Sequence, residues 1–324
     1  MVTRDSNCFQ LIEEVEVIDM GNRRNVVKTR YYFDPENLPP DYEKHAEPDY
    51  LTRPVEKEYQ RYPVGMTNYT NFFSEEELLD FEDKAEVTYN DANQGIFLPM
   101  TAQKTYSDRM GQHVTRVKLF FGYRYLWKDF ELQDPESFVG AGIRADVSKP
   151  PAWIKDNVAK PMEDAGIIPK NFLNSFALNL YYDGTEGLGQ HFDDDTRFMQ
   201  PIFTFRLFSD SRLTFGAHGY GFMNNAYFVP LARGCICAME KGSYSANGMK
   251  HCVRKDDMTG KSAAFILRQM HPQAIKEALT LDREVEMPRW ISSLGISDNS
   301  VPYHEQKIRY LQELVLKKNC GQKS

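Results

Sequence analysis

Short apolar runs, separated by turn-forming residues, follow one another between residues 172 and 270. No helical pattern intervenes between them, so each run is expected to be a β-strand. Many short strands without helices between them are typical of an antiparallel sandwich or barrel. The expected strands are FALNLYY (176–182), PIFTFRLF (201–208), RLTFG (212–216), AYFVPL (226–231), GCICAME (234–240) and SAAFILRQ (262–269).

Helical patterns flank this strand-rich region. Ser74 and Glu77 form the sequence signature of a capping box, which predicts a helix over about 74–90. A second helix is expected over 150–166, where Pro161 should kink or split it. Two more are expected at 274–285 and 303–318, and the segment 113–127 is expected to form strand, turn and strand. The chain is therefore predicted to be an α+β protein.

The bulk properties indicate a globular intracellular protein. The 324 residues are 41% hydrophobic, and no apolar run is long enough to cross a membrane. The first residues lack the pattern of a secretory signal, and five scattered cysteines suit a reducing compartment, the nucleus or the cytoplasm. Cys235 and Cys237 have no second cysteine pair, so structural zinc is not expected.

The charge is unevenly distributed. The net charge of −7 argues against a chain that coats nucleic acid over its whole surface. Residues 101–128, however, contain six basic side chains and one acidic one. This segment is either a solvated face or a local groove for an anionic partner.

Two histidines and one aspartate form the candidate metal site. His191 and Asp193 follow an apolar strand and a Gly-rich turn, and His251 precedes another strand. Two imidazoles and one carboxylate occupy one face of a ferrous ion and leave its other positions open for a cosubstrate and dioxygen. The same ligand set also suits Mn(II).

Three other downstream histidines are less suited to complete this site. His218 follows Asp193 by only 25 residues, which leaves too few strands for the chain to return across a sandwich. His271 and His304 lie beyond the last expected strand. His251 is therefore the expected third ligand.

Together with this triad, five segments resemble the AlkB-like iron(II)- and 2-oxoglutarate-dependent dioxygenases. The stretch 114–270 is similar to their eukaryotic branch that demethylates N-methyladenine in RNA. The resemblance implies a double-stranded β-helix, or jelly roll, with the metal at its open end. The helices that the sequence pattern predicts would flank this core on its N-terminal and C-terminal sides. The matching segments are KLFFGYRY (118–125), NLYYDG (179–184), the His191 and Asp193 pair, FSDSRLTFG (208–216) and HCVRKDD with AAFILR (251–268).

Composition and pattern, together with the resemblance over 114–270, predict a domain organisation. An irregular N-terminal arm is expected over 1–62, and a dioxygenase domain over 63–271. Within that domain the jelly-roll core should span about 172–270, and a nucleotide-recognition segment about 101–145. A helical extension is expected over 272–324.

The resemblance assigns further residues to the cosubstrate and the substrate. Asn179 and Tyr181 match positions that hydrogen-bond 2-oxoglutarate, although both residue types also occur as polar groups inside barrels. Arg268 matches the second of two family arginines on the last strand. Lys118 and Tyr125 match positions near the nucleotide, with a solvated lysine and ordinary strand packing as the alternatives.

The first of the two family arginines is missing, because Ser262 occupies its position. A doubly charged cosubstrate needs a cationic partner inside a barrel. Arg206 interrupts an otherwise apolar strand and is the hypothesised replacement. The alternatives are an outward Arg206 that pairs with a surface acid, and Lys261, which alternation places on the opposite face from Arg268.

A second departure from the family concerns Cys252. It matches a cysteine that is disulfide-bonded in the similar branch, but Ala217 occupies the position of the partner. Cys252 is therefore expected to be a free thiol.

The expected function is oxidative demethylation of an N-methylated nucleobase with Fe(II), dioxygen and 2-oxoglutarate. The partner is expected to be methylated nucleic acid, RNA rather than DNA, and no membrane. Arg116 and the neighbouring aromatic residues are expected to cover one side of the entrance, and Arg254 is a further candidate wall residue. The alternatives are a protein hydroxylase or lysine demethylase of the same chemistry, and a non-catalytic jelly-roll scaffold.

Overall fold

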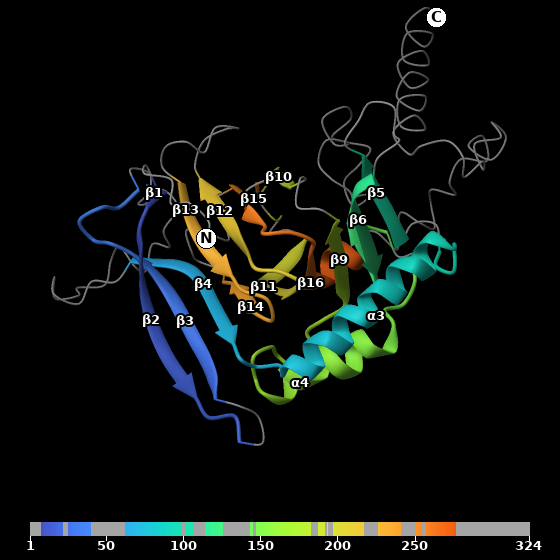
Figure 1. Ribbon diagram of the computed structural model, residues 1–324, viewed down its shortest axis with the longest axis horizontal. Helices are drawn as coiled ribbons and strands as arrows, with labels where there is room; N and C mark the ends of the chain where they lie inside the picture. The colour runs from blue at the N-terminus through green and yellow to red at the C-terminus, as the bar shows by residue number, and fades with distance from the viewer. Residues whose placement is uncertain are drawn as a thin grey trace, which may run out of the picture.

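The fold is described from a computed structural model. The described residues are 8–21, 25–39, 62–98, 101–106, 114–125, 143–144, 147–182, 187–191, 193, 197–216, 226–240, 250–254 and 257–276. The central element of this fold is a pair of facing β-sheets, with helices on one side (Figure 1).

Eight consecutive strands are divided equally between the two sheets and form the jelly roll. One sheet contains the order β14-β11-β16-β9, and the other contains β13-β12-β15-β10, with antiparallel neighbours throughout. This arrangement of two facing four-stranded sets confirms the predicted fold class. The strands are β9 (Ser175–Tyr181), β10 (Leu188–His191), β11 (Phe198–Leu207), β12 (Ser211–Gly216), β13 (Ala226–Leu231), β14 (Ile236–Met239), β15 (Lys250–Val253) and β16 (Ser262–Met270).

The larger sheet, which we call the major sheet, extends beyond the jelly roll on both sides. Next to β9 lies β6 (Val114–Phe121), and next to β6 lies β5 (Ala102–Tyr106). Strand β6 is the first of the two strands predicted within 113–127. A two-stranded sheet pairs β7 (Arg124–Tyr125) with β8 (Ile143–Arg144). The smaller, minor sheet gains β1 (Cys8–Phe9), which pairs in parallel with β13.

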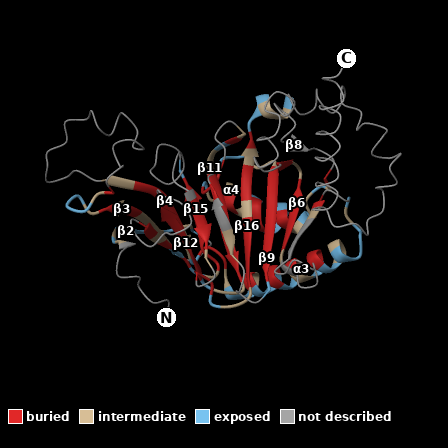
Figure 2. Cartoon of the chain, turned by 90° about the horizontal axis from the view of Figure 1, so that it is seen from above, coloured by how far each residue is buried: buried red, intermediate tan, exposed pale blue. Residues whose placement is uncertain are grey.

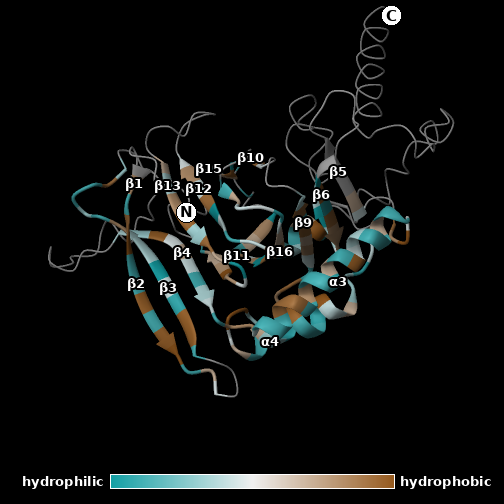
Figure 3. Ribbon diagram, viewed as in Figure 1, coloured by the Kyte–Doolittle hydropathy of each residue, from teal (hydrophilic) through white to brown (hydrophobic). Residues whose placement is uncertain are grey.

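The N-terminal region differs from the irregular arm that was expected over 1–62. Beside β14 lie β4 (Tyr62–Thr70), β3 (Val26–Phe33) and β2 (Leu11–Ile18), so a hairpin continues the major sheet. The expectation was wrong for these strands because β2 pairs with β3 and β3 pairs with β4, and local pattern does not reveal such contacts. Strand β2 bears both hydrophilic and hydrophobic residues along its length (Figure 3).

The predicted capping box is present at the start of α3 (Glu75–Asn93). Ser74 accepts a hydrogen bond from the Glu77 backbone, and the Glu77 side chain accepts one from the Ser74 backbone. The helix expected over 150–166 is present, but the expected split at Pro161 is not. A π-helical segment η4 (Ile154–Ala159) continues directly into α4 (Lys160–Asp164), and the backbone stays helical at the junction.

The C-terminal predictions are described only in part. Residues 272–276 are helical, which agrees with the beginning of the helix expected over 274–285. The rest of that segment and the helix expected over 303–318 lie outside the described residues. Within the part of the chain that is described, no helix is long and apolar enough to span a membrane.

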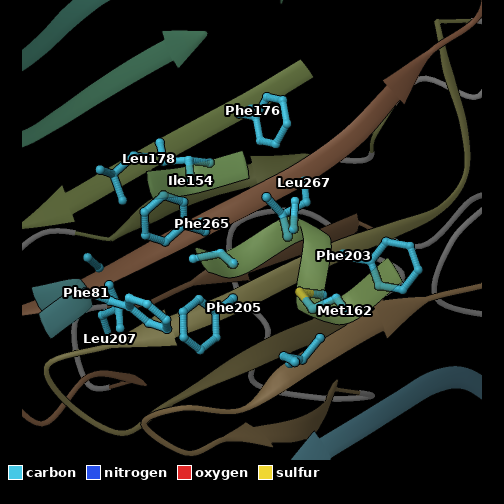
Figure 4. Close-up of a cluster of buried hydrophobic side chains, with 14 of the residues drawn as sticks. Phe81, Ile154, Met162, Phe176, Leu178, Phe203, Phe205, Leu207, Phe265 and Leu267 are labelled. Carbon is cyan, nitrogen blue, oxygen red and sulfur yellow. The ribbon is translucent and has the colours of Figure 1, made fainter. Parts of the chain in front are cut away.

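Apolar residues on one face of the major sheet pack against the helices. Phe81 of α3, Ile154 of η4 and Met162 of α4 meet Phe205 of β11 and Phe265 of β16 in one buried cluster (Figure 4). The central strands are buried, whereas α3 exposes much of its outer side (Figure 2). This cluster fixes the helix-covered face, and therefore the positions that alternate with it face the minor sheet.

Candidate metal centre and active site

The three predicted metal ligands lie together between the two sheets. His191 ends β10, Asp193 follows two residues later, and His251 lies opposite His191 in the antiparallel pair of β10 and β15. All three are buried, and one ligand atom from each lies within 4.8 Å of the others. The ring centroids of the two histidines are 4.3 Å apart. Segments remote in sequence thus form one compact donor set.

The electrostatics of this donor set suit a divalent cation. Burial disfavours the charge of Asp193, but Arg268 and the two histidines outweigh burial and lower the pKa of the carboxyl group. Burial lowers the pKa of His251 against the opposing influence of Asp193. An ionised carboxylate and a neutral imidazole are the protonation states in which these side chains bind metals. Imidazole and carboxylate donors without cysteine fit Fe(II).

Polar side chains form a row across the inner face of the major sheet. Arg206 of β11 lies opposite Ala264 of β16, Ala264 lies opposite Asn179 of β9, and Asn179 lies opposite Lys118 of β6. Neighbours in a sheet are about 4.8 Å apart, so the row from Arg206 to Asn179 spans about 10 Å. Tyr181 lies two residues beyond Asn179 on the same face.

Several polar atoms near this row have no hydrogen-bond partner among the described residues. They are buried atoms of Asn179 (Oδ1), Ser262 (Oγ) and Arg206 (Nε and Nη1). Buried polar groups are normally satisfied, so unpaired ones indicate a place for a polar ligand. A dicarboxylate such as 2-oxoglutarate fits a wall that offers an amide, a hydroxyl and a guanidinium.

Arg268 connects the metal centre to the predicted substrate residues. Its Nη2 donates to Asp193 Oδ1 at 2.8 Å, and its guanidinium lies 4.9 Å from the centroid of the Tyr125 ring. Lys118 Nζ is 3.1 Å from the Tyr125 hydroxyl. Both Lys118 and Tyr125 are buried, so Lys118 is not the solvated lysine of the alternative interpretation.

The remaining predicted residues occupy different surroundings. Arg116 donates to the Gly187 carbonyl oxygen at 2.7 Å and lies 5.9 Å from the Tyr181 ring. The Arg254 side chain contacts Asp257 and lies 4.8 Å from the centroid of the Phe228 ring. Phe228 alternates with the inward-facing Tyr227 on β13, so these contacts lie on the outer face of the minor sheet. The substrate roles of Arg116 and Arg254 stay predictions.

The structure also describes the surroundings of the Cys252 thiol and of the Lys261 amine. Cys252 is a buried free cysteine, as expected. Lys261 forms an ion pair with Glu86 of α3 and lies 4.4 Å from the centroid of the Phe208 ring. The Lys261 side chain therefore lies on the helix-covered side of the major sheet, away from the metal centre.

Sequence reasoning did not single out Asp257 or Ala264. The fully buried Asp257 accepts hydrogen bonds from Arg212, Thr214 and the Arg254 backbone, which anchors the chain just after the ligand strand β15. Ala264 supplies the small side chain between Arg206 and Asn179. An acid in the loop after His251 was visible in the sequence, but its partners depend on the pairing of β12 with β15.

Comparison with known proteins supports the resemblance found in the sequence. No family model matches the chain. It is 28% identical over 210 residues to the RNA demethylase ALKBH5 of Xenopus tropicalis, and this alignment covers 62% of this chain and 54% of that protein. It is 26% identical over 239 residues to the RNA demethylase ALKBH5 of Bos taurus, with 71% and 57% covered. The chain spans about half the length of the curated relatives it matches.

Among solved structures, that of OsALKBH1 aligns with 64% of this chain and 97% of its own, at 16% identity and a TM-score of 0.35. A TM-score this low does not establish a shared fold. The jelly roll and its buried His, Asp, His centre are those expected of a 2-oxoglutarate-dependent dioxygenase. The sequence relatives confirm the more particular resemblance, to the AlkB-like family and its RNA demethylase branch.

Proposed function

We propose that this protein oxidatively demethylates an N-methylated nucleobase, methyladenine in RNA or single-stranded DNA, with Fe(II), dioxygen and 2-oxoglutarate. The observation that carries the proposal is the buried donor set of His191, Asp193 and His251 beside a wall of unpaired polar atoms. The relatives' shared name, RNA demethylase ALKBH5, supports RNA as the first substrate to test.

The chain's own residues have separate tasks in this proposal. Bound iron and 2-oxoglutarate would supply the oxidation of the N-methyl carbon to a hydroxymethyl group, from which formaldehyde is lost. His191, Asp193 and His251 would hold the metal, and Asn179 and Tyr181 would orient the cosubstrate. The ion pair from Arg268 holds the Asp193 carboxylate in place beside both histidines.

The substrate side of the proposal rests on the environment of Tyr125 and Lys118. Lys118 donates a hydrogen bond to Tyr125, the Tyr125 ring packs against the Arg268 guanidinium, and Arg268 pairs with Asp193. One chain of contacts therefore joins them to the candidate metal centre. A base could reach this place only outside a helical stack, because the centre is enclosed between sheets. Unpaired loops and ends of RNA present bases in that way.

The test is a turnover assay with three substrates. The protein is incubated with Fe(II), ascorbate and 2-oxoglutarate, and with methyladenine RNA, the matching DNA or a methylated histone peptide. Formaldehyde and succinate are measured, and the nucleosides are quantified by mass spectrometry. We expect loss of methyladenine from RNA with equal formaldehyde release, abolished in His251→Ala and retained in His271→Ala, which alters an exposed histidine.

The other outcomes identify the alternatives. Turnover of the peptide alone would replace the proposal with a protein hydroxylase or lysine demethylase. An absence of succinate with every substrate, in protein shown to bind Mn(II), would indicate a non-catalytic scaffold.

A further inference from the structure

The guanidinium of Arg206 is a buried charge without an ion pair in the described part of the protein. Its side chain is 2% exposed, and no described carboxylate forms an ion pair with it. Its Nε and Nη1 atoms have no hydrogen-bond partner there either. A buried, unpaired cation is costly, so its retention indicates a ligand that neutralises it.

The titratable groups that act on Arg206 are Tyr181, Cys235, Cys237 and Asp257, and none of them forms an ion pair with it. Burial raises the pKa of the Cys235 thiol to about 12, and burial raises that of Cys237 as well, so both are neutral at pH 7. Asp257 is bound to Arg212 and Thr214. No protein anion among the described residues therefore balances the charge of Arg206.

The other basic side chains on the inner face of the major sheet already have polar partners. Arg268 is paired with Asp193, and Lys118 with Tyr125. Arg116 donates to the Gly187 carbonyl oxygen. Lys261, the alternative replacement, is paired with Glu86 on the opposite side of the sheet. An anionic ligand that enters this barrel, where Asp193 already pairs with Arg268, would thus find Arg206 available as its cationic partner.

The residues beside Arg206 leave room for such an anion. Ala264 is its direct neighbour on β16, and Ser262 lies two residues away on the same face. Ser262 is completely buried and its hydroxyl is unpaired. On the far side of Ala264 is Asn179, which also has an unpaired oxygen.

We infer that Arg206, assisted by the Ser262 hydroxyl, binds the distal carboxylate of a five-carbon 2-oxo dicarboxylate, an inference that rests on the proposed function. Arg206 lies on β11, the strand that pairs with β16, which carries Ser262. A planar guanidinium binds a carboxylate through two parallel hydrogen bonds. Arg206 therefore sets the preference of this site for a dicarboxylate over a 2-oxo monocarboxylate.

The test compares two ligands of the Mn(II)-loaded full-length protein by isothermal titration calorimetry. They are 2-oxoglutarate and 2-oxopentanoate, which has a methyl group in place of the distal carboxylate. We expect the wild type to prefer 2-oxoglutarate by on the order of 100-fold or more. Arg206→Met should bind both ligands equally, at the wild-type affinity for 2-oxopentanoate. The control Lys261→Met should keep the wild-type preference.

A second measurement separates a ligand-binding role from a structural one. In the ligand-free protein, Arg206→Met removes an unpaired charge, so its melting temperature should stay equal or rise. Its further increase on addition of 2-oxoglutarate should be lost. A variant that melts lower without ligand and still responds to 2-oxoglutarate would overturn the inference. Arg206→Lys, which keeps the charge, should show an intermediate preference.

The failures of the two proposals are distinguishable. If Arg206→Met keeps the wild-type preference for 2-oxoglutarate, or if Lys261→Met loses it, the Arg206 inference is wrong and the proposed function stands. If the wild type binds neither ligand in the presence of Mn(II), the proposed function fails and the inference fails with it.

Discussion

Asp193 has two partners of different kinds in this fold. It is a candidate metal ligand beside two histidines, and it is also the counter-ion of the buried Arg268. Although burial opposes the charge of Arg268, Asp193 and Tyr125 raise its pKa. The carboxylate therefore contributes to stability in the absence of metal through its ion pair with Arg268.

We expect Asp193→Asn to lower the stability of the metal-free protein as well as its affinity for metal. Losing one member of a buried ion pair costs about 3 kcal/mol, because the remaining charge stays buried. Chemical denaturation of the metal-free protein should show this decrease in the free energy of unfolding, and Mn(II) binding should fall. Asp83→Asn, which changes an exposed acid of α3, is the control. Equal unfolding curves for Asp193→Asn and the wild type would contradict the expectation.

The buried cysteines are expected to be unreactive in the folded protein. Burial raises the pKa of both Cys235 and Cys252 to about 12. At pH 8 the thiolate fraction is then on the order of 1 in 10,000, and the thiolate is the reactive form. Iodoacetamide at pH 8, followed by peptide mass spectrometry, should leave both unlabelled until denaturant is added. Rapid labelling of Cys252 under native conditions would show that the chain around β15 opens.

At the scale of elements, the contact of β10 with β15 sets the distance between the two histidines. Gly187 begins this contact, and a Cβ atom there would lie 1.8 Å from the Val253 carbonyl oxygen. That atom is backbone, so the clash can be relieved only by moving one strand from the other. His191 lies on one of these strands and His251 on the other.

Gly187→Ala should therefore lower Mn(II) affinity by about tenfold or more, a loss typical of changes to the groups that orient metal ligands. Titration with Mn(II), followed by electron paramagnetic resonance, measures it. Gly260→Ala is the matched control, since a Cβ atom at Gly260 meets nothing within 4 Å. If both variants bind Mn(II) as the wild type does, then β10 and β15 do not fix the metal geometry.

Local sequence was sufficient for some elements and insufficient for others. The capping box at Ser74 is a local effect and is present in the structure, whereas the split expected at Pro161 is absent because the helical backbone continues through it. The hairpin of β2 and β3 was missed because it is stabilised by pairing with β4, which lies 29 residues beyond the end of β3. Strand existence depends on such partners more than helix existence does.

The candidate site shows the same division. The three candidate metal ligands could be singled out because each has a recognisable local context, and the structure brings them together. The row of Arg206, Ala264 and Asn179 could not be derived, because it depends on the register of three strands. The pairing of Arg268 with Asp193 joins residues 75 positions apart and has no local signal.

For the whole molecule, the distribution of charge bears on how an anionic substrate would be held. The net charge is −7, yet residues 101–128 contain six basic side chains and one acidic one. Lys118 is buried beside Tyr125, so it belongs to the interior rather than to a solvated face. Binding of a nucleic acid would therefore depend on a local set of cations within an otherwise acidic protein.

Affinity for single-stranded methylated RNA should accordingly fall steeply with salt. Each phosphate contact to a single strand contributes about −0.7 to the slope of log affinity against log salt, so three contacts give about −2. Fluorescence anisotropy across a salt series measures this slope. Arg116→Ala should make it shallower by about 0.7. Lys160→Ala, which alters an exposed lysine of α4 paired with Asp164, should not change it. A flat dependence in the wild type would mean that the long-range attraction of phosphates contributes little, and that the substrate is recognised through its base alone or is not a nucleic acid.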